Sequence, residues 1–368
     1  MSTPSGPPAA ESDDQDPTLG PRGGQTRNHL GSSGSATPSS AGNGGRERVI
    51  ALVLGAGGSA GHAFHSGVLA ALADHGGWDA RHAELIIGTS AGSGVSALLR
   101  GGMSPADIYA HQRGRALSAE GQEVVDRLPL APWDSGDIGD HRVLPASAPL
   151  ALRGLLRWPP RPGVSLTGLL PRGARSSQPL GDRYGALHSR WPDRTLWLVA
   201  VRMRDGKRVV FGRDDHPPLN VGTAVQASSA IPGFFTPIRL DNNEYVDGGV
   251  WSATNADLVN GLGFDALVVS APLAGPFDLA ALRRQFSARN AARAYHRATL
   301  HDELRQVRRA GTPVISFEAG PEHATLLANN NQRAGGGTDI AEAAYASVLQ
   351  RLETDPSLVE LLNPRVPA

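Results

Sequence analysis

Two short apolar runs, each followed at once by a glycine-rich loop and a helical pattern, constrain the fold more than any other feature. The run RVIALVL at 48–54 precedes a glycine cluster at 55–61, after which apolar side chains recur at helical spacing over 62–75. The run ELII at 84–87 ends in Gly-Thr-Ser-Ala-Gly at 88–92, and a further helical segment follows. This alternation is typical of an α/β fold whose buried strands run parallel.

The rest of the chain continues this alternation around one irregular stretch. Strands are predicted at 195–202, 208–211, 236–240, 264–270 and 313–317, and helices at 221–230, 277–310 and 339–353. Asp205-Gly206 is a strong hairpin signal between the first two of these strands. Residues 119–192 are rich in proline and show no regular period, so we expect an insertion or cap over the sheet.

An N-terminal tail differs sharply from the ordered chain. In residues 1–47 the only large apolar side chains are Met1, Leu19 and Leu30, so we expect this segment to be disordered. It lacks the apolar stretch of a secretory signal. No apolar run in the chain approaches the roughly 18 residues that a transmembrane helix needs. These features favour a cytoplasmic location.

The charge balance and the lack of cysteine exclude several kinds of function. Lys and Arg total 35, as do Asp and Glu, and a net charge of zero argues against binding nucleic acid by bulk electrostatics. With no cysteine, the chain forms no disulfide, thiolate metal site or cysteine nucleophile. A nucleophile must therefore come from another residue type.

Ser90 is the candidate nucleophile, because it lies between a predicted strand and a predicted helix in the pattern Gly88-x-Ser90-x-Gly92. Glycines at both flanks permit a sharp, strained turn that lifts the hydroxyl above the sheet edge. The helix that follows directs its amino terminus at negative charge developing there. An ordinary glycine-rich loop is the alternative interpretation.

The glycine cluster at 55–61 is a candidate anion site, because consecutive glycines leave backbone N–H groups unobstructed at the start of a helix. The pattern Gly55-x-Gly57-x-x-Ala60 also resembles a dinucleotide-binding loop. That interpretation requires an acidic residue at the end of the second strand, which here ends in Gly-Thr-Ser at 88–90. We therefore favour an oxyanion-stabilising loop.

The base that activates the serine is either a carboxylate or a histidine. Asp247 ends a short apolar approach and precedes Gly248 and Gly249, although Asp-Gly-Gly is also an ordinary turn sequence. Three late histidines would complete a Ser-Asp-His order of the α/β-hydrolase type: His296, His301 and His323. Against this triad, no HGGG-type motif precedes the serine.

Four ordered blocks resemble the patatin-like phospholipases. They are Leu54–Leu69 (LGAGGSAGHAFHSGVL), Gly88–Gly92 (GTSAG), Ala227–Ile238 (ASSAIPGFFTPI) and Val246–Asn255 (VDGGVWSATN). The similarity covers about 48–270, and a weaker similarity extends to about 325. It implies a three-layer α/β/α domain at 48–325 with a mostly parallel central sheet, a lid at about 119–192 and a C-terminal helical extension at 326–368.

The resemblance also implies a chemistry. Ser90 would be the nucleophile and Asp247 the general base of a dyad without histidine, and the amides of Gly57 and Gly58 would form the oxyanion hole. The loops would be shaped by six further glycines: Gly55, Gly61, Gly88, Gly92, Gly248 and Gly249. The reaction would be hydrolysis of a lipid carboxylic ester through an acyl-serine, with no metal or organic cofactor.

Three positions depart from the family pattern. Ala56 replaces the first glycine of a run of three, Ala60 replaces a basic residue, and Ala256 follows Asn255 where the family has proline nearby. The loss of the basic residue leaves open a phospholipid, a neutral lipid, a lysolipid or a short-chain ester as substrate. It also leaves open a catalytically weak lipid-binding or regulatory protein.

Two segments are candidates for peripheral membrane contact. The stretch 277–310 carries eight arginines against three acidic residues, as in a basic amphipathic helix on an anionic bilayer. A helix packed on the core with a solvated polar face is the alternative. The second candidate is an interfacial lid formed by Trp158 with four leucines: Leu155, Leu156, Leu169 and Leu170. No feature of the sequence indicates an oligomeric state.

Overall fold

The computed structural model describes residues 46–129, 146–156, 162–214, 219–275, 288–320, 323 and 336–363. Nearly all of the predicted tail therefore lies outside the described residues, as do Trp158, Arg283 and Arg284. Residues 45–368 form one structural unit.

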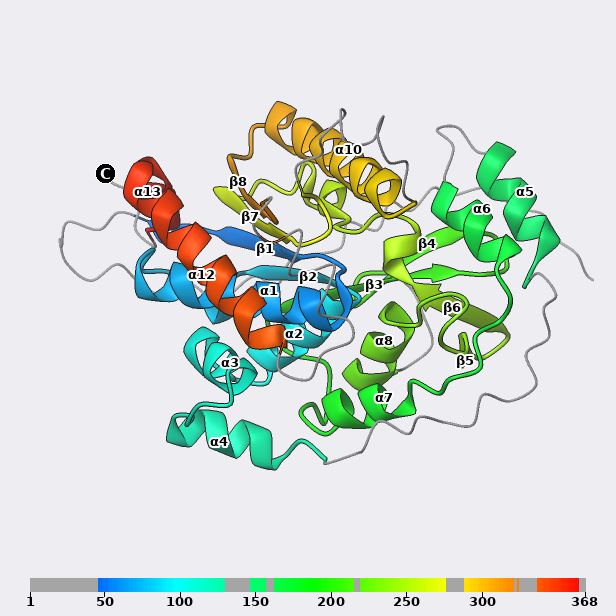
Figure 1. The fold of residues 1–368 in the computed structure, drawn as a ribbon, viewed down its shortest axis with the longest axis horizontal. Helices are drawn as coiled ribbons and strands as arrows, with labels where there is room; N and C mark the ends of the chain where they lie inside the picture. The colour runs from blue at the N-terminus through cyan, green and yellow to red at the C-terminus, as the bar shows by residue number, and fades with distance from the viewer. Residues whose placement is uncertain are drawn as a thin grey trace, which may run out of the picture. The chain divides into compact units, whose positions relative to one another are not determined.

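One mixed sheet contains the eight described strands in the order β5-β6-β3-β2-β1-β7-β8, and β4 pairs with β3 off this path (Figure 1). The strands are β1 (Ile50–Leu54), β2 (Leu85–Thr89), β3 (Thr195–Arg202), β4 (Lys207–Phe211), β5 (Ile238–Leu240), β6 (Asn243–Asp247), β7 (Ala266–Ala271) and β8 (Val314–Glu318). Strands β3, β2, β1, β7 and β8 run parallel, and β4 and β6 run antiparallel to β3. The predicted mostly parallel sheet is confirmed.

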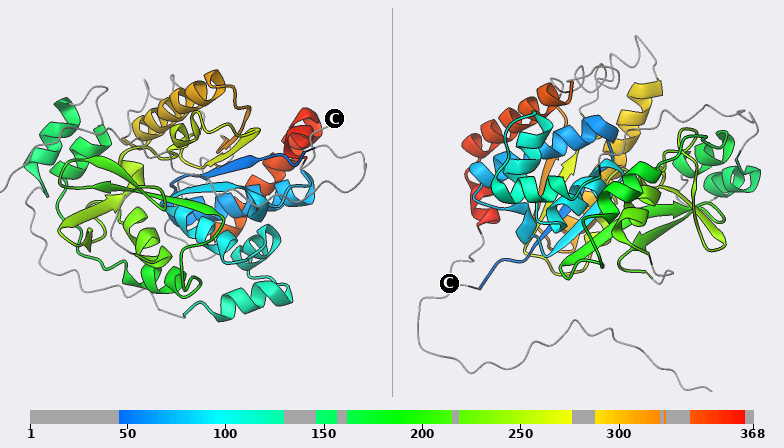
Figure 2. Two further views of the ribbon diagram at one scale, coloured as in Figure 1. Left: turned by 180° about the vertical axis from the view of Figure 1, so that it is seen from behind. Right: turned by 90° about the horizontal axis from the view of Figure 1, so that it is seen from below.

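Helices lie on both faces of this sheet (Figure 2). They are α1 (Gly58–Asp74), α2 (Ala91–Arg100), α3 (Pro105–Gln112), α4 (Ala119–Asp126), α5 (Ala148–Leu156), α6 (Pro162–Leu169), α7 (Gln178–Gly185), α8 (Val221–Ser228), α10 (Ala288–Arg309), α12 (Gly336–Thr354) and α13 (Ser357–Leu362). Three 3₁₀ turns are η1 (Ala80–His82), η2 (Gly248–Val250) and η3 (Ala256–Val259). No helix in these ranges is long and apolar enough to cross a membrane.

Successive side chains of β1 pack alternately against the helices on the two faces of the sheet. Leu52 and Leu54 belong to the main core with α1, α2, α8 and α12, whereas Ala51 and Val53 belong to a second core with η3 and α10. Successive residues of a strand point to opposite faces, so an unbroken apolar run indicates a strand covered on both sides. The three-layer α/β/α prediction is confirmed.

The structure differs from the sequence interpretation in the stretch 119–192. This stretch contains α4, α5, α6 and α7, although the sequence showed no regular period. Helix α7 packs on α8, and Tyr184 and Leu187 are buried in the main core. The helices are short and interrupted by proline, so a helical period extends over too few residues to be recognised.

Helix α10 packs on the core through its apolar face. Leu300, Leu304 and Val307 are almost completely buried in the second core. For residues 288–309, the structure therefore shows the alternative of a core-packed helix with a solvated polar face, instead of a helix whose apolar face is free for a bilayer.

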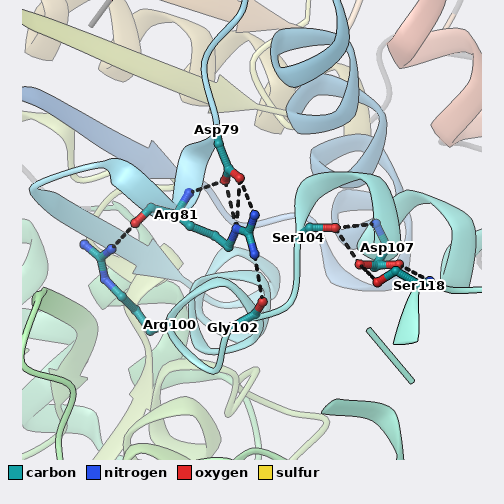
Figure 3. Close-up of polar contacts among 7 residues, drawn as sticks. All are labelled: Asp79, Arg81, Arg100, Gly102, Ser104, Asp107 and Ser118. Carbon is teal, nitrogen blue, oxygen red and sulfur yellow. Dashed lines mark hydrogen bonds and ion pairs between the residues drawn. The ribbon is translucent and has the colours of Figure 1, made fainter. Parts of the chain in front are cut away.

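A polar cluster fixes the carboxyl end of α2, at the far end of the helix from Ser90 (Figure 3). Arg100 donates to the carbonyl oxygen of Arg81 at 3.0 Å, and Arg81 in turn pairs with Asp79 at 2.6 Å. Nearby, the Asp107 carboxylate accepts the Ser118 hydroxyl at 2.8 Å. A cation at a helix carboxyl terminus is favourable, so Arg100 stabilises the helix that begins after Ser90.

Candidate active site

The register of the sheet brings Ser90 and Asp247 together. Thr89, the last residue of β2, pairs with Val199 of β3, and Asp247, the last residue of β6, pairs with Ala200. Strand β4 occupies the other edge of β3, so β2 and β6 share one edge and run toward each other. Their carboxyl ends therefore meet, although the two residues are far apart in the chain.

Ser90 has a strained backbone that its surroundings hold in place. It caps α2 with φ 54° and ψ −118°, a region that residues with a β-carbon rarely occupy. Its N–H donates to Ser228 Oγ at 3.0 Å, and its carbonyl oxygen accepts Ser93 Oγ at 2.5 Å. These bonds satisfy the turn's polar backbone, and the side chain is left to face Asp247.

Gly92 lets α2 lie against the end of β1. A β-carbon at Gly92 would lie 2.0 Å from the carbonyl oxygen of Leu54, so no larger residue fits. The Gly92 N–H donates to the Gly55 carbonyl oxygen at 3.2 Å. The second glycine of the serine motif therefore joins the elbow to the glycine loop.

Asp247 is a buried carboxyl group that faces Ser90. Burial raises its pKa to about 6, and hydrogen bonds from the Ser90 side chain and the Gly249 N–H act in the opposite direction. The Gly249 N–H lies 2.7 Å from Asp247 Oδ1. A carboxylate with this pKa is ionised at neutral pH and still basic enough to accept a proton.

The glycine loop borders both members of this pair. A β-carbon at Gly61 would lie 3.4 Å from Ala91 Cβ, and one at Gly249 would lie 3.4 Å from Ala56 Cβ. Gly57 is the N-cap of α1, and Gly58 begins the helix with φ +61°. The amides of Gly57 and Gly58 have no hydrogen-bond partner among the described residues, as expected at a helix amino terminus.

Ala60 and His65 lie behind this loop. Ala60, one of the three departures noted in the sequence, is buried in the first turn of α1. His65 Nε2 lies 2.8 Å from the Gly55 carbonyl oxygen, which can only accept, so Nε2 carries the hydrogen. Nδ1 then accepts from Ser270 Oγ at 2.7 Å. Burial lowers the pKa of His65 to about 3, so a neutral imidazole holds the loop.

A second support lies behind Asp247. Asn255 has a left-handed backbone with φ +56°, and its Nδ2 donates to Thr89 Oγ1 at 3.1 Å. Glu303 Oε2 of α10 accepts Thr254 Oγ1 at 2.7 Å and the Ala256 N–H at 3.0 Å. Burial, and then the charge of Asp257, raise the pKa of Glu303 to about 7. The loop after Asp247 is thus tied both to the residue before Ser90 and to α10.

Sequence reasoning missed the role of Glu303 and counted it only as one of three acids on a basic helix. A signal was present, because Glu303 stands between Leu300, Leu304 and Val307 on the face that is buried. An acid within an apolar helical stripe indicates a buried carboxyl with specific partners.

Removing the Glu303 carboxyl is expected to destabilise the protein. Glu303→Leu leaves the buried Ala256 N–H and Thr254 hydroxyl without an acceptor, and we expect a loss of about 2–4 kcal/mol in the free energy of unfolding. Glu303→Gln retains an acceptor oxygen and is expected to cost less than about 1 kcal/mol. Urea denaturation at pH 6 measures both, and equal losses would show that these two bonds are unimportant.

The late histidines do not join the pair. His301 Nε2 lies 3.0 Å from Glu318 Oε1, and His323 Nδ1 accepts the Gly320 N–H at 3.0 Å. The His296 ring packs on Tyr295. No hydrogen bond links a histidine to Ser90 or Asp247 in the described part of the chain.

Comparisons with known proteins give a family match and several more distant similarities. A family model described as Patatin-like phospholipase matches residues 52–260. The "Probable lipid hydrolase 463L" of Invertebrate iridescent virus 6 is 32% identical over 63 residues, 17% of this chain and 22% of that protein. The match thus spans about a fifth of that relative. The structure of VipD from Legionella pneumophila covers 84% of this chain and 67% of that chain, at 15% identity and a TM-score of 0.40.

Proposed function

The chain belongs to the patatin-like phospholipase family, and from this premise we propose that it hydrolyses carboxylic esters of lipids with a Ser90–Asp247 dyad. One observation carries the proposal: the buried Asp247 carboxyl faces the Ser90 side chain where β2 and β6 meet, and that side chain lowers the pKa of the carboxyl. A nucleophile in contact with a base whose pKa is shifted by burial is the arrangement that acyl transfer requires.

Each step of the reaction has a group to perform it. Asp247 takes the hydroxyl proton as Ser90 Oγ attacks the ester carbonyl, and the amides of Gly57 and Gly58 stabilise the oxyanion. When the tetrahedral intermediate collapses, the C–O bond breaks and Asp247 returns the proton to the leaving alcohol. Water then attacks the acyl-serine with Asp247 again as base, which releases the acid and restores Ser90.

We favour the dyad over a Ser-Asp-His triad because no hydrogen bond links a histidine to Asp247 among the described residues. The Asp247 carboxylate accepts the Gly249 N–H at 2.7 Å and faces the Ser90 side chain, which lowers its pKa. The alanine at position 60 does not affect the proposed oxyanion hole, because that hole consists of backbone amides. Its consequence is for recognition of the lipid head group. The substrate class is therefore a lipid ester whose head group is not specified by a basic side chain at position 60.

Covalent labelling tests the proposal. A fluorophosphonate probe is expected to label Ser90 in the wild-type protein, and peptide mapping would locate it. The labelling rate should rise as the pH passes through about 6, because Asp247 must lose its proton before it can act as a base. Ser90→Ala should abolish labelling, and Ser59→Ala, at an exposed serine of the glycine loop, should not. Labelling at a different serine would contradict the assignment.

A further inference from the structure

Most of the exposed apolar side chains come from two packed helices and from the loop after α8, in which a β-carbon at Gly233 would lie 3.7 Å from Leu170, the residue after α6. The described residues expose nine large apolar side chains, and seven of them come from α5, α6 and the loop after α8. They are between 41% and 75% exposed: Leu152, Leu155, Leu156, Leu166, Leu169, Ile231 and Phe234. We call these seven residues the apolar surface. Concentrations of this kind mark interaction sites in soluble proteins.

The leucines of the apolar surface face away from the core. Helices α5 and α6 pack side by side and bury Leu150 and Val164 in a third core cluster beneath them (Figure 1). The exposed leucines stand two, five or six positions after these buried residues, which places them about 140–240° around each helix. Both helices therefore present leucine outward.

The apolar surface adjoins the segments that hold the candidate dyad. A β-carbon at Gly163 of α6 would lie 2.2 Å from the carbonyl oxygen of Val250, in the turn directly after Asp247. On the other side, the Asp247 N–H donates to the Ala230 carbonyl oxygen at 3.0 Å, and Ile231 follows Ala230. An apolar phase that covers this surface would thus lie beside Asp247.

Charge indicates what covers the apolar surface. Residues 146–175 contain no Asp or Glu and five arginines: Arg153, Arg157, Arg161, Arg172 and Arg175. Arg153 is exposed on α5, and the Arg175 guanidinium lies 4.6 Å from the centre of the exposed Phe234 ring. Among the described arginines of this stretch, Arg172 pairs with Glu244, whereas Arg153 and Arg175 form no ion pair. Exposed leucine next to unbalanced arginine is complementary to an anionic lipid surface.

We propose that the apolar surface docks the protein on anionic bilayers, with leucines in the acyl region and arginines at the head groups. The choice of lipid as partner rests on the proposed function, because a lipid hydrolase must reach an ester within a bilayer. The site of contact itself rests on the exposure and charge of α5, α6 and the loop after α8.

Vesicle co-sedimentation tests this docking, with Ser90→Ala protein so that the lipid is not consumed. We expect binding to phosphatidylglycerol-containing vesicles, weaker binding to pure phosphatidylcholine, and a decrease as salt is raised. Leu155→Ser/Leu156→Ser is expected to lower the partition coefficient about tenfold or more, because two exposed leucines no longer enter the bilayer. The control Leu262→Ser, at a leucine that is 48% exposed elsewhere, should bind like the parent.

Three results would overturn the proposal. The parent protein could fail to bind anionic vesicles, or the double variant could bind as strongly as the parent. Alternatively, light scattering could show a dimer that the double variant dissociates, which would assign the surface to a second copy of the chain.

A further measurement separates the docking proposal from the proposed Ser90–Asp247 dyad: turnover of a water-soluble short-chain ester by protein with Ser90 intact. Vesicle binding without ester turnover contradicts the dyad alone, and turnover without vesicle binding contradicts the docking alone.

Discussion

Asp247→Asn is expected to lower turnover of an acyl ester by about 10³-fold or more and, above pH 6, to raise the free energy of unfolding. Asparagine has nearly the same shape and keeps an oxygen for the Gly249 N–H, which lies 2.7 Å from Asp247 Oδ1. It cannot take the proton of Ser90, so the nucleophile is no longer activated. The fold should therefore persist while the chemistry is lost.

The gain in stability follows from the pKa of Asp247, which is raised from 3.8 to about 6 chiefly by burial. A carboxyl whose pKa is higher in the folded state favours folding while it is protonated, and this advantage is lost as the pH rises from about 4 through 6. Above pH 6 the buried charge costs at most about 3 kcal/mol, which asparagine avoids. The difference between the two proteins should disappear near pH 3.

Urea denaturation at pH 3, 6 and 8, with ester turnover measured at pH 8, checks both effects. Asp193→Asn is the matched control, since that carboxylate is 78% exposed, and neither quantity should change. If Asp247→Asn retains turnover, the dyad is wrong. If it is less stable than the wild type at pH 8, burial does not dominate the energetics of this carboxyl.

Outside 119–192, local patterns in the sequence were sufficient to predict the alternation of strands and helices. The runs at 48–54 and 84–87 are apolar throughout because β1 and β2 are covered on both faces, and the glycines after them follow the carboxyl ends of these strands. Asp205-Gly206 joins β3 to β4 because Gly206 adopts a left-handed backbone with φ +65°, which this turn requires. These features depend on neighbours in the chain.

The geometry of the candidate site depends on long-range pairing instead. Ser90 and Asp247 meet because β2 and β6 occupy consecutive parts of one edge of β3, and no pattern around either residue encodes that register. Glu303 reaches the same region from α10, outside the residues that the family model matches. The sequence therefore indicated which residues to consider, and the sheet explains why they come together.

Gly92→Ala is expected to lower the free energy of unfolding by at least about 3 kcal/mol, opposite in sign to the effect that helix propensity predicts. Gly92 lies in α2, and alanine in a helix is ordinarily about 1 kcal/mol better than glycine. Here the added carbon would meet the Leu54 carbonyl oxygen at 2.0 Å, which is backbone of β1 and has no rotamer to change. Either α2 moves away from β1 or the fold is lost.

Displacement of α2 would also move Ser90, so turnover should fall together with stability. Gly77→Ala is the matched control, because Gly77 has φ +64° and no atom within 4 Å of the added carbon. It should cost only about 1 kcal/mol, from the left-handed backbone alone, and leave turnover unchanged. Equal losses of stability in the two variants would show that the close approach of α2 to β1 is not what Gly92 provides. A Gly92→Ala protein as stable as the wild type would show that the contact can relax, so the second glycine of the motif would then be dispensable for the elbow.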